Sequence, residues 1–198
     1  MVGLIIKRIF DIAASLLVLF VFSPFWLIII IMIKANSPGP IFFVQERPGW
    51  QGKIFKVYKF RSMVVNSEAM VKGKEVAKDD ERITWTGKFL RRSKIDEIPQ
   101  LLNVLKGEMS LIGPRPERIE SLAEYDEEIA KRLNMRPGLT GLAQVCGNIY
   151  LPLEKRYQFD VYYVERFSLL LDLRILLRTV NVVIFGEERY VNKPLVTL

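Results

Sequence analysis

The segment from Ile12 to Ile33 constrains this chain most, because it is almost wholly apolar and is interrupted only by Ser15, Ser23 and Pro24. A helix of about 22 residues rises roughly 33 Å, which is enough to cross a bilayer. The segment has no small-residue cleavage pattern, so we expect the protein to retain it. Pro24 removes a backbone hydrogen bond and bends a helix, and the Ser23 hydroxyl can satisfy the freed carbonyl. We therefore predict a membrane helix that is broken at Ser23 and Pro24.

The charges that flank this segment bear on its path through the membrane. Lys7 and Arg8 lie near its start, and Lys34 follows it. Because cations favour the cytoplasmic side, both ends of the segment prefer the same face. A re-entrant helix pair, which enters and leaves by one face, satisfies that preference. A kinked helix that crosses the bilayer is the other arrangement that the length permits, and the residues alone leave both open.

Beyond the apolar segment, the chain is predicted to form one mostly helical α+β domain. The turn-forming run NSPGP, at Asn36 to Pro40, separates a membrane segment of residues 1–35 from a domain of residues 36–198. Hydrophobic patterning predicts three further helices. They are Glu117–Met135, Leu153–Arg166 and Leu169–Phe185. The first is amphipathic; the last is apolar on most faces, as in a helix that lies in a membrane interface or is buried against the domain.

Two runs near the start of the domain predict a small β-hairpin. Ile41–Glu46 and Lys53–Met63 are rich in aromatic and β-branched residues, and residues 47–49 (RPG) are expected to form the turn between them. The polar stretch that follows, residues 66–82, lacks an apolar stripe and is interpreted as a long surface loop.

An acidic pair, Asp96 and Glu97, lies at the expected start of a short helix that Gly107 should end. A helix N-terminus carries free N–H groups and partial positive charge, so it favours ionised carboxylates and attracts phosphate oxygens. Asp96 has two interpretations, a helix N-cap or a catalytic carboxylate. A cap needs one carboxylate, whereas this site has two. It also has three cations just before them, Arg91, Arg92 and Lys94.

A stiff loop, Gly113–Pro116 (GPRP), follows the short helix. Proline fixes its own φ and restricts the residue before it, so Arg115 should be held extended between Pro114 and Pro116. A guanidinium positioned in this way suits bidentate contact with phosphate or carboxylate. A surface turn with an ion pair is the other interpretation of these residues.

Charge and composition limit the chemistry. The chain of 198 residues has 29 Lys and Arg against 22 Asp and Glu, and its net charge of +7 favours phosphate-bearing partners such as nucleic acid, anionic lipid or nucleotide-like substrates. There is no histidine, and Cys146 is the single cysteine, which excludes a Cys/His zinc site, a histidine triad and an internal disulfide. Any bound metal should therefore be a hard cation with oxygen ligands, such as Mg²⁺.

Four motifs occur in a fixed order: KVYKFRSM, KIDEIPQLLNVLKGEMSLIGPRP, RPGLTGLAQV and FDVYY. In these motifs the chain resembles the bacterial sugar transferase family, the small monotopic phosphoglycosyl transferases that start membrane-linked glycan assembly. The resemblance covers nearly the whole chain, including Ser23 and Pro24, and it implies that the apolar segment is re-entrant. It also implies a place in the bacterial inner membrane, with the catalytic domain on the cytoplasmic face.

The resemblance further implies a reaction. A phosphosugar would move from a UDP-sugar to a polyprenyl phosphate such as undecaprenyl phosphate, with release of UMP and a requirement for Mg²⁺. Asp96 matches the family's nucleophile, which forms a covalent aspartyl phosphosugar, and Glu97 matches its partner in metal binding or proton transfer. Both are expected metal ligands. The positions that match substrate- and phosphate-binding residues are Lys59, Arg91, Arg115 and Asp160.

Two other functions would explain part of the sequence. A non-catalytic membrane-anchored scaffold or anionic-polymer binder would use the basic hairpin, but it leaves the acidic pair without a role. Aromatic residues among those cations also suit nucleic acid, but we favour a half-buried hairpin with a solvated basic face and expect no nucleic-acid partner. A glycosyltransferase that moves sugar alone would release UDP instead of UMP.

One position departs from the family pattern. Some relatives carry an Asn-Gly-Arg-Asn run after the AQV motif, whereas this chain has Cys146, Gly147, Asn148 and Ile149. Asn148 therefore stands where those relatives have arginine, and we expect sugar or phosphate recognition to differ here.

Overall fold

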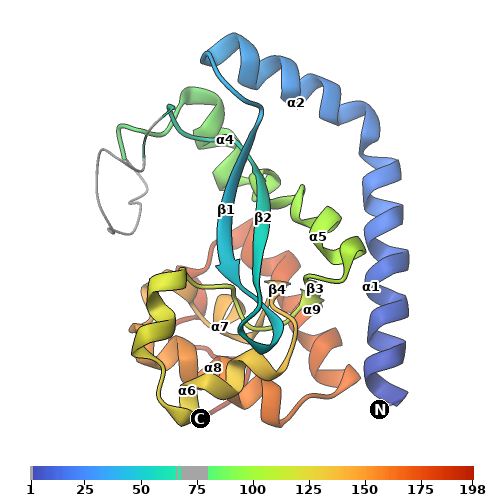
Figure 1. Cartoon of the computed structure of the whole chain (residues 1–198), viewed down its shortest axis with the longest axis vertical. Helices are drawn as coiled ribbons and strands as arrows, with labels where there is room; N and C mark the ends of the chain where they lie inside the picture. Colours follow the sequence, from blue (N-terminus) through green and yellow to red (C-terminus); the bar gives the residue numbers. More distant parts are fainter. Residues whose placement is uncertain (1, 66, 68–79) are drawn as a thin grey trace.

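The computed structural model describes residues 2–65, 67 and 80–198, and within them the protein is mostly helical with two small sheets (Figure 1). The predicted α+β class and the small hairpin are therefore confirmed. Most of the predicted loop at residues 66–82 lies outside the described residues.

The N-terminal apolar segment forms two helices, α1 (Val2–Val21) and α2 (Ser23–Asn36), which are bent by 65° where they meet. The Ser23 hydroxyl donates a 2.8 Å hydrogen bond to the carbonyl of Phe20. That carbonyl is the one that an N–H at Pro24 would otherwise have bonded. The apolar segment is thus broken into two helices as predicted, and Ser23 makes the expected hydrogen bond. Among the described helices, none is by itself long and apolar enough to cross a membrane, although this bent pair meets that test by length and composition.

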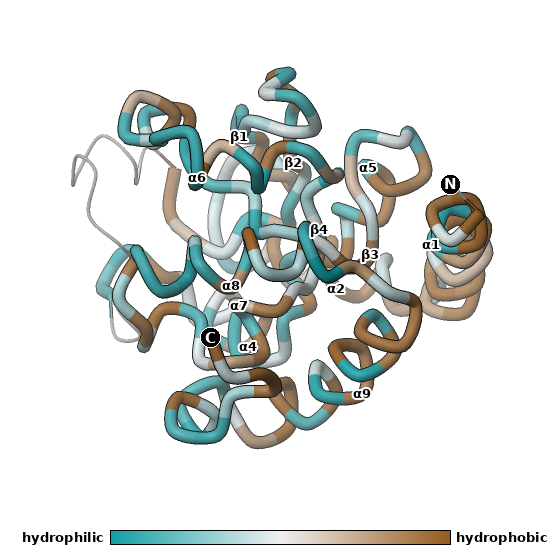
Figure 2. Tube along the Cα trace, turned by 90° about the horizontal axis from the view of Figure 1, so that it is seen from below, coloured by the Kyte–Doolittle hydropathy of each residue, from teal (hydrophilic) through white to brown (hydrophobic). Residues whose placement is uncertain are grey.

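Helix α1 turns a polar stripe toward the rest of the protein. Its buried residues are Lys7, Asp11 and Ser15, which are spaced one helical turn apart. The Lys7 ammonium donates to Asp172 over 2.8 Å, and Asp11 accepts a 3.0 Å hydrogen bond from the backbone N–H of Leu111. Most of the large apolar side chains of α1 are exposed instead, and Figure 2 shows the hydrophobic character of this helix and of α9 (Leu169–Phe185).

The hairpin consists of β1 (Phe42–Pro48) and β2 (Ile54–Phe60), which pair antiparallel with Phe42 opposite Phe60. The predicted turn is misplaced, because residues 47 and 48 still pair with β2. The connection is instead a 3-10 turn, Trp50–Gly52, in which Gln51 has a left-handed φ of 57°. Pro48 is tolerated here because a two-stranded sheet has only edge strands, where proline's missing N–H is harmless.

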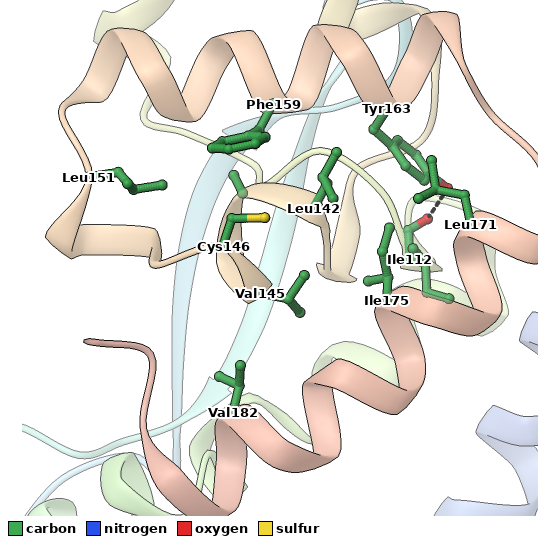
Figure 3. Close-up of a cluster of buried hydrophobic side chains, with 11 residues drawn as sticks. Ile112, Leu142, Val145, Cys146, Leu151, Phe159, Tyr163, Leu171, Ile175 and Val182 are labelled. Atoms are coloured by element: carbon green, nitrogen blue, oxygen red, sulfur yellow. Dashed lines mark hydrogen bonds between the residues drawn. The ribbon is translucent and has the colours of Figure 1, made fainter. Parts of the chain in front are cut away.

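The main core lies where α7 (Leu142–Val145) packs between α8 (Leu153–Glu165) and α9 (Figure 3). Helices α8 and α9 confirm the helices predicted at Leu153–Arg166 and Leu169–Phe185. Leu142 and Val145 meet Phe159 from α8 and Ile175 from α9, and all four are fully buried or nearly so. The hydroxyl of Tyr163 donates to the carbonyl of Ile112 and so joins α8 to the strand β3 (Ser110–Ile112).

The single helix predicted at Glu117–Met135 is wrong. This stretch contains a 3-10 helix η3 (Ile119–Glu124), a short helix α6 (Glu127–Ala130) and a second 3-10 turn η4 (Lys131–Asn134). Asp126 explains the interruption, because its carboxylate accepts a 2.7 Å hydrogen bond from the N–H of Ile129 and caps a new helix.

A second sheet, which the sequence did not predict, pairs β3 in parallel with β4 (Gly138–Thr140). Directly after β3, the chain runs close to β4 at Gly113 and Gly138, because neither residue has a side chain. A Cβ on Gly138 would lie 2.1 Å from the nitrogen of Gly113. The N–H of Gly138 donates to the carbonyl of Pro114 over 2.9 Å, so this contact fixes the loop that contains Arg115.

Candidate active site

The acidic pair lies in a 3-10 turn, η2 (Ile95–Glu97), between α4 (Trp85–Arg92) and α5 (Gln100–Lys106). Lys94 occupies the capping position of this turn with a left-handed φ of 58°, and no side chain caps it. The N-cap interpretation of Asp96 is therefore wrong. The end of α5 is as predicted, because Gly107 follows it with a φ of 85°.

Glu97 binds two of the predicted cations. Its Oε1 accepts from Nζ of Lys59 over 2.6 Å and from the guanidinium of Arg115 over 3.4 Å. Burial alone would raise the pKa of Glu97, but the charges of Lys59 and Arg115 outweigh burial and hold that pKa well below its usual range. Glu97 therefore stays ionised, and it brings the hairpin and the GPRP loop together at one point.

Asp96 is buried, with 7% of its surface exposed, and its carboxylate has no hydrogen bond or ion pair with the residues that the structure describes. Burial raises the pKa of Asp96, and the neighbouring charge of Glu97 raises it further, against the opposing effect of Lys59, Arg91 and Lys94. All lone pairs of this carboxylate are thus left available to a reacting atom.

Arg91 lies in the last turn of α4, with its Nε 3.1 Å from the hydroxyl of Ser62. The start of α4 is fastened to α2, because the N–H of Thr86 donates to Asn36 and its hydroxyl to the carbonyl of Met32. Arg91 consequently lies on a helix that is fastened to α2.

The chain after β2 is fastened to the same helix. Arg61 donates to the carbonyls of Ser37 and Pro38 over 2.6 and 2.9 Å, just past the end of α2. Lys59 lies two residues before this anchor. The segments that supply Arg91 and Lys59 are thus both tied to α2 or to the residues just past it.

Asp160 lies at the base of the GPRP loop, where it forms a buried ion pair with Arg132. Arg132 also donates a 2.7 Å hydrogen bond to the carbonyl of Arg115. Burial raises the pKa of Asp160, and Arg132 opposes this effect. Asp160 thus supports Arg115 through Arg132, and a direct role in phosphate binding stays a prediction.

Four residues of the site were outside the predicted set of site residues: Lys94, Arg132, Asn148 and Glu187. Glu187 accepts a 2.6 Å hydrogen bond from Lys94 and a 3.0 Å hydrogen bond from the amide of Asn148. Lys94 was visible in the sequence as a cation beside the acidic pair. Arg132 lies in the stretch that was predicted as one amphipathic helix, and Glu187 belongs to no motif, so neither residue was singled out from the sequence.

Asp96 and Glu97 are the carboxylates that could hold a metal ion here. In the described part of the chain, no group of three or more Asp, Glu, Cys or His side chains is arranged to bind one. The pair nonetheless fits Mg²⁺, which is commonly held by one or two carboxylates together with substrate phosphates. The unpartnered oxygens of Asp96 supply ligands of the required kind.

The described residues combine a mostly helical fold, a bent apolar helix pair and a buried carboxylate near several cations, an arrangement suited to binding an anionic substrate. The chain belongs to the bacterial sugar transferase family, whose model matches residues 2–186.

Relatives of two lengths support this assignment. The chain is 43% identical to the uncharacterized sugar transferase EpsL of Bacillus subtilis, over 93% of this chain and 90% of that protein. It is also 43% identical to the UDP-N-acetylgalactosamine-undecaprenyl-phosphate N-acetylgalactosaminephosphotransferase of Aeromonas hydrophila, over 91% of this chain and 44% of that protein. The undecaprenyl-phosphate galactose phosphotransferase of Salmonella typhimurium is 40% identical, over 93% of this chain and 42% of that protein. The chain thus spans less than half the length of the two relatives whose names state a reaction.

Proposed function

We propose that this protein is a phosphoglycosyl transferase, which moves a phosphosugar from a UDP-sugar to a polyprenyl phosphate such as undecaprenyl phosphate and releases UMP. The observation that carries the proposal is the contrast within the acidic pair. Glu97 is bound by Lys59 and Arg115, whereas Asp96 is buried beside them without a partner in the described chain. The names of two relatives, which pair undecaprenyl phosphate with an N-acetylgalactosamine or a galactose phosphotransferase, support the general class of this reaction.

In the first step, an oxygen of Asp96 attacks the phosphorus that bears the sugar. A bond forms between that oxygen and phosphorus as the bond to the bridging oxygen breaks, and the bridging oxygen leaves with UMP. In the second step, a phosphate oxygen of the lipid attacks the same phosphorus. The bond to Asp96 breaks, its carboxylate is restored, and the phosphosugar is joined to the lipid phosphate.

The neighbouring cations bind and orient the donor. Lys59 and Arg115 face one side of Glu97, and a diphosphate that enters there would share them with that carboxylate. Because phosphoryl transfer depends mainly on positioning and charge neutralisation, this arrangement supplies what the reaction needs without histidine. Mg²⁺ held by Asp96, Glu97 and the donor phosphates would neutralise further charge on the diphosphate.

The way in which α1 packs against the rest of the protein supports a place in the membrane. Its polar stripe is buried against the protein while apolar side chains such as Leu17 and Phe20 are exposed, the reverse of a helix on the surface of a water-soluble domain. On α4, Trp85 and Phe89 are also exposed, and this helix is fastened to α2. We infer that α1 and α2 form a re-entrant pair in the bacterial inner membrane and that the catalytic domain lies on the cytoplasmic face, within reach of a lipid phosphate.

Labelling of single cysteines tests the re-entrant path. The native Cys146 is buried, so cysteines placed by Val2→Cys and Ala35→Cys, each in its own variant, can be labelled selectively. A membrane-impermeant maleimide should label neither site in spheroplasts and both sites after lysis. Labelling of one of the two in intact spheroplasts would indicate a spanning helix and overturn the re-entrant path.

Nucleotide release tests the reaction. The purified protein in nanodiscs is incubated with Mg²⁺, a short polyprenyl phosphate and a panel of UDP-sugars, and UMP is resolved from UDP. Acceptor-dependent UMP from one donor is expected, and that donor identifies the sugar. UDP would instead mean transfer of the sugar alone.

The nucleophile needs its own test. Without acceptor, a peptide that contains Asp96 should gain the mass of the phosphosugar, and Asp96→Asn should abolish both this adduct and turnover. The control Glu154→Gln, on the exposed face of α8, should retain both. Turnover by Asp96→Asn would rule out the assignment of the nucleophile.

A further inference from the structure

Glu187 joins the end of α9 to the turn that contains the acidic pair. It follows Gly186, which ends α9, and its side chain is only 10% exposed. One carboxylate oxygen accepts from the ammonium of Lys94 over 2.6 Å, and the other accepts from the amide of Asn148 over 3.0 Å. The proposed reaction assigns no role to Glu187.

The cations whose charges act on Asp96 and Glu97 have other partners. They are Lys59, Arg91, Lys94 and Arg115. Glu97 binds the first and the last, and Arg91 donates to the hydroxyl of Ser62. The remaining cation, Lys94, is bound by Glu187. This arrangement leaves Asp96 as the carboxylate of the site that has no ion pair within the described chain.

Lys94 is the cation best placed to change this arrangement. It lies two residues before Asp96, and its side chain is long and flexible, so its ammonium can reach either carboxylate. Its charge already acts on Asp96 from its present position. Because Asp96 is buried, an ion pair formed there would be poorly screened by water and would hold the carboxylate strongly. A carboxylate held in this way is a weaker nucleophile.

We propose that Glu187 keeps Lys94 away from Asp96, so that the attacking carboxylate stays unpaired until the donor arrives. The inference rests on the proposed role of Asp96 as nucleophile. Glu187 is then a positioning residue, which acts on the reaction through Lys94. Asn148 supports it by holding the second oxygen of the same carboxylate, and its own backbone is left-handed, with a φ of 47°, a conformation that asparagine adopts more readily than most residues.

The test measures the first step alone, as the rate of UMP formation without acceptor. Glu187→Gln removes the charge that holds Lys94 while keeping the size of the side chain. We expect this rate to fall about 10-fold, which corresponds to about 1.4 kcal/mol of added barrier. Adding Lys94→Met to Glu187→Gln removes the released ammonium, so the double variant should recover to within about 3-fold of Lys94→Met alone.

The matched control is Glu188→Gln. Glu188 is the next residue along the chain, it is exposed, and it forms no ion pair with the described residues, so its substitution should leave the rate unchanged. Recovery by a second substitution separates this role from a merely structural one, because removing another side chain does not repair a damaged fold.

Each result decides between distinct conclusions. If the unaltered protein forms UMP and the double variant is as slow as Glu187→Gln, the inference about Glu187 is wrong while the proposed function stands. An unchanged rate of UMP formation in Glu187→Gln would also refute the inference about Glu187 and leave the proposed function standing. If the unaltered protein forms no UMP from any donor, the proposed function fails and the inference fails with it.

Discussion

Replacing Asp160 by asparagine should destabilise the protein strongly, because it breaks a fully buried ion pair. The side chains of Arg132 and Asp160 are 2% and 1% exposed, so water cannot replace the lost carboxylate. Breaking a buried pair by removing one partner costs about 3–5 kcal/mol. Arg132 keeps contacts with the rings of Tyr125 and Tyr157 and with the carbonyl of Arg115, which favours the lower end of that range.

A loss of about 3 kcal/mol corresponds to a fall in Tm of about 6–12 °C for a chain of this size. Thermal unfolding in detergent micelles, followed by tryptophan fluorescence, measures this change. Glu154→Gln, an exposed substitution on the same helix, is the control and should shift Tm by no more than about 2 °C. A shift for Asp160→Asn that stays within this control range would refute the reasoning.

The same variant separates two roles for Asp160. If Asp160 supports Arg115 through Arg132, activity measured well below the lowered Tm should show a raised KM for the UDP-sugar together with the loss of stability. If Asp160 instead contacts the substrate itself, Asp160→Asn should lose activity at an unchanged Tm.

Three further predictions concern α1, the GPRP loop and the metal. Lys7→Met leaves Asp172 without its cation, so Tm should fall by about 6–12 °C. The control Lys88→Met, at an exposed position, should leave Tm unchanged. Equal Tm values for the two variants would contradict a stabilising role of the buried pair between Lys7 and Asp172. Arg115→Lys keeps the charge but loses the two-pronged donor, so UMP release should slow about 100-fold, and a rate near that of the unaltered protein would exclude a guanidinium-specific contact. EDTA should stop UMP release and added Mg²⁺ should restore it, while activity that persists in EDTA would remove the metal from the proposal.

Features with a local cause were predicted from the sequence. Ser23 and Pro24 break the apolar segment because proline removes an N–H and the serine hydroxyl bonds the freed carbonyl, and both effects act within four residues. Gly107 ends α5 because it adopts a left-handed φ without a steric cost. Helices α8 and α9 follow from their hydrophobic patterning in the same way.

Features that depend on distant contacts were not predictable in this way. Glu187 and Lys94 are 93 positions apart, and an ion pair of that kind leaves no periodic pattern in the chain. Arg132 lies within the single helix predicted at Glu117–Met135, and its burial with Asp160 depends on how α8 packs against η4, a contact that no local pattern encodes. The motifs located Lys59, Arg91 and Arg115, but only the fold reveals that Glu97 binds two of them and leaves Asp96 unpaired.

The inverted packing of α1 separates the residues that attach this helix to the domain from those that face outward. Lys7 and Asp11 form the attachment, while Leu16, Leu17 and Phe20 are exposed. A protein engineer can therefore redesign the two faces independently. Replacing the outward leucines and phenylalanine with glutamate and lysine would leave the attachment intact and make this part of the outward face hydrophilic.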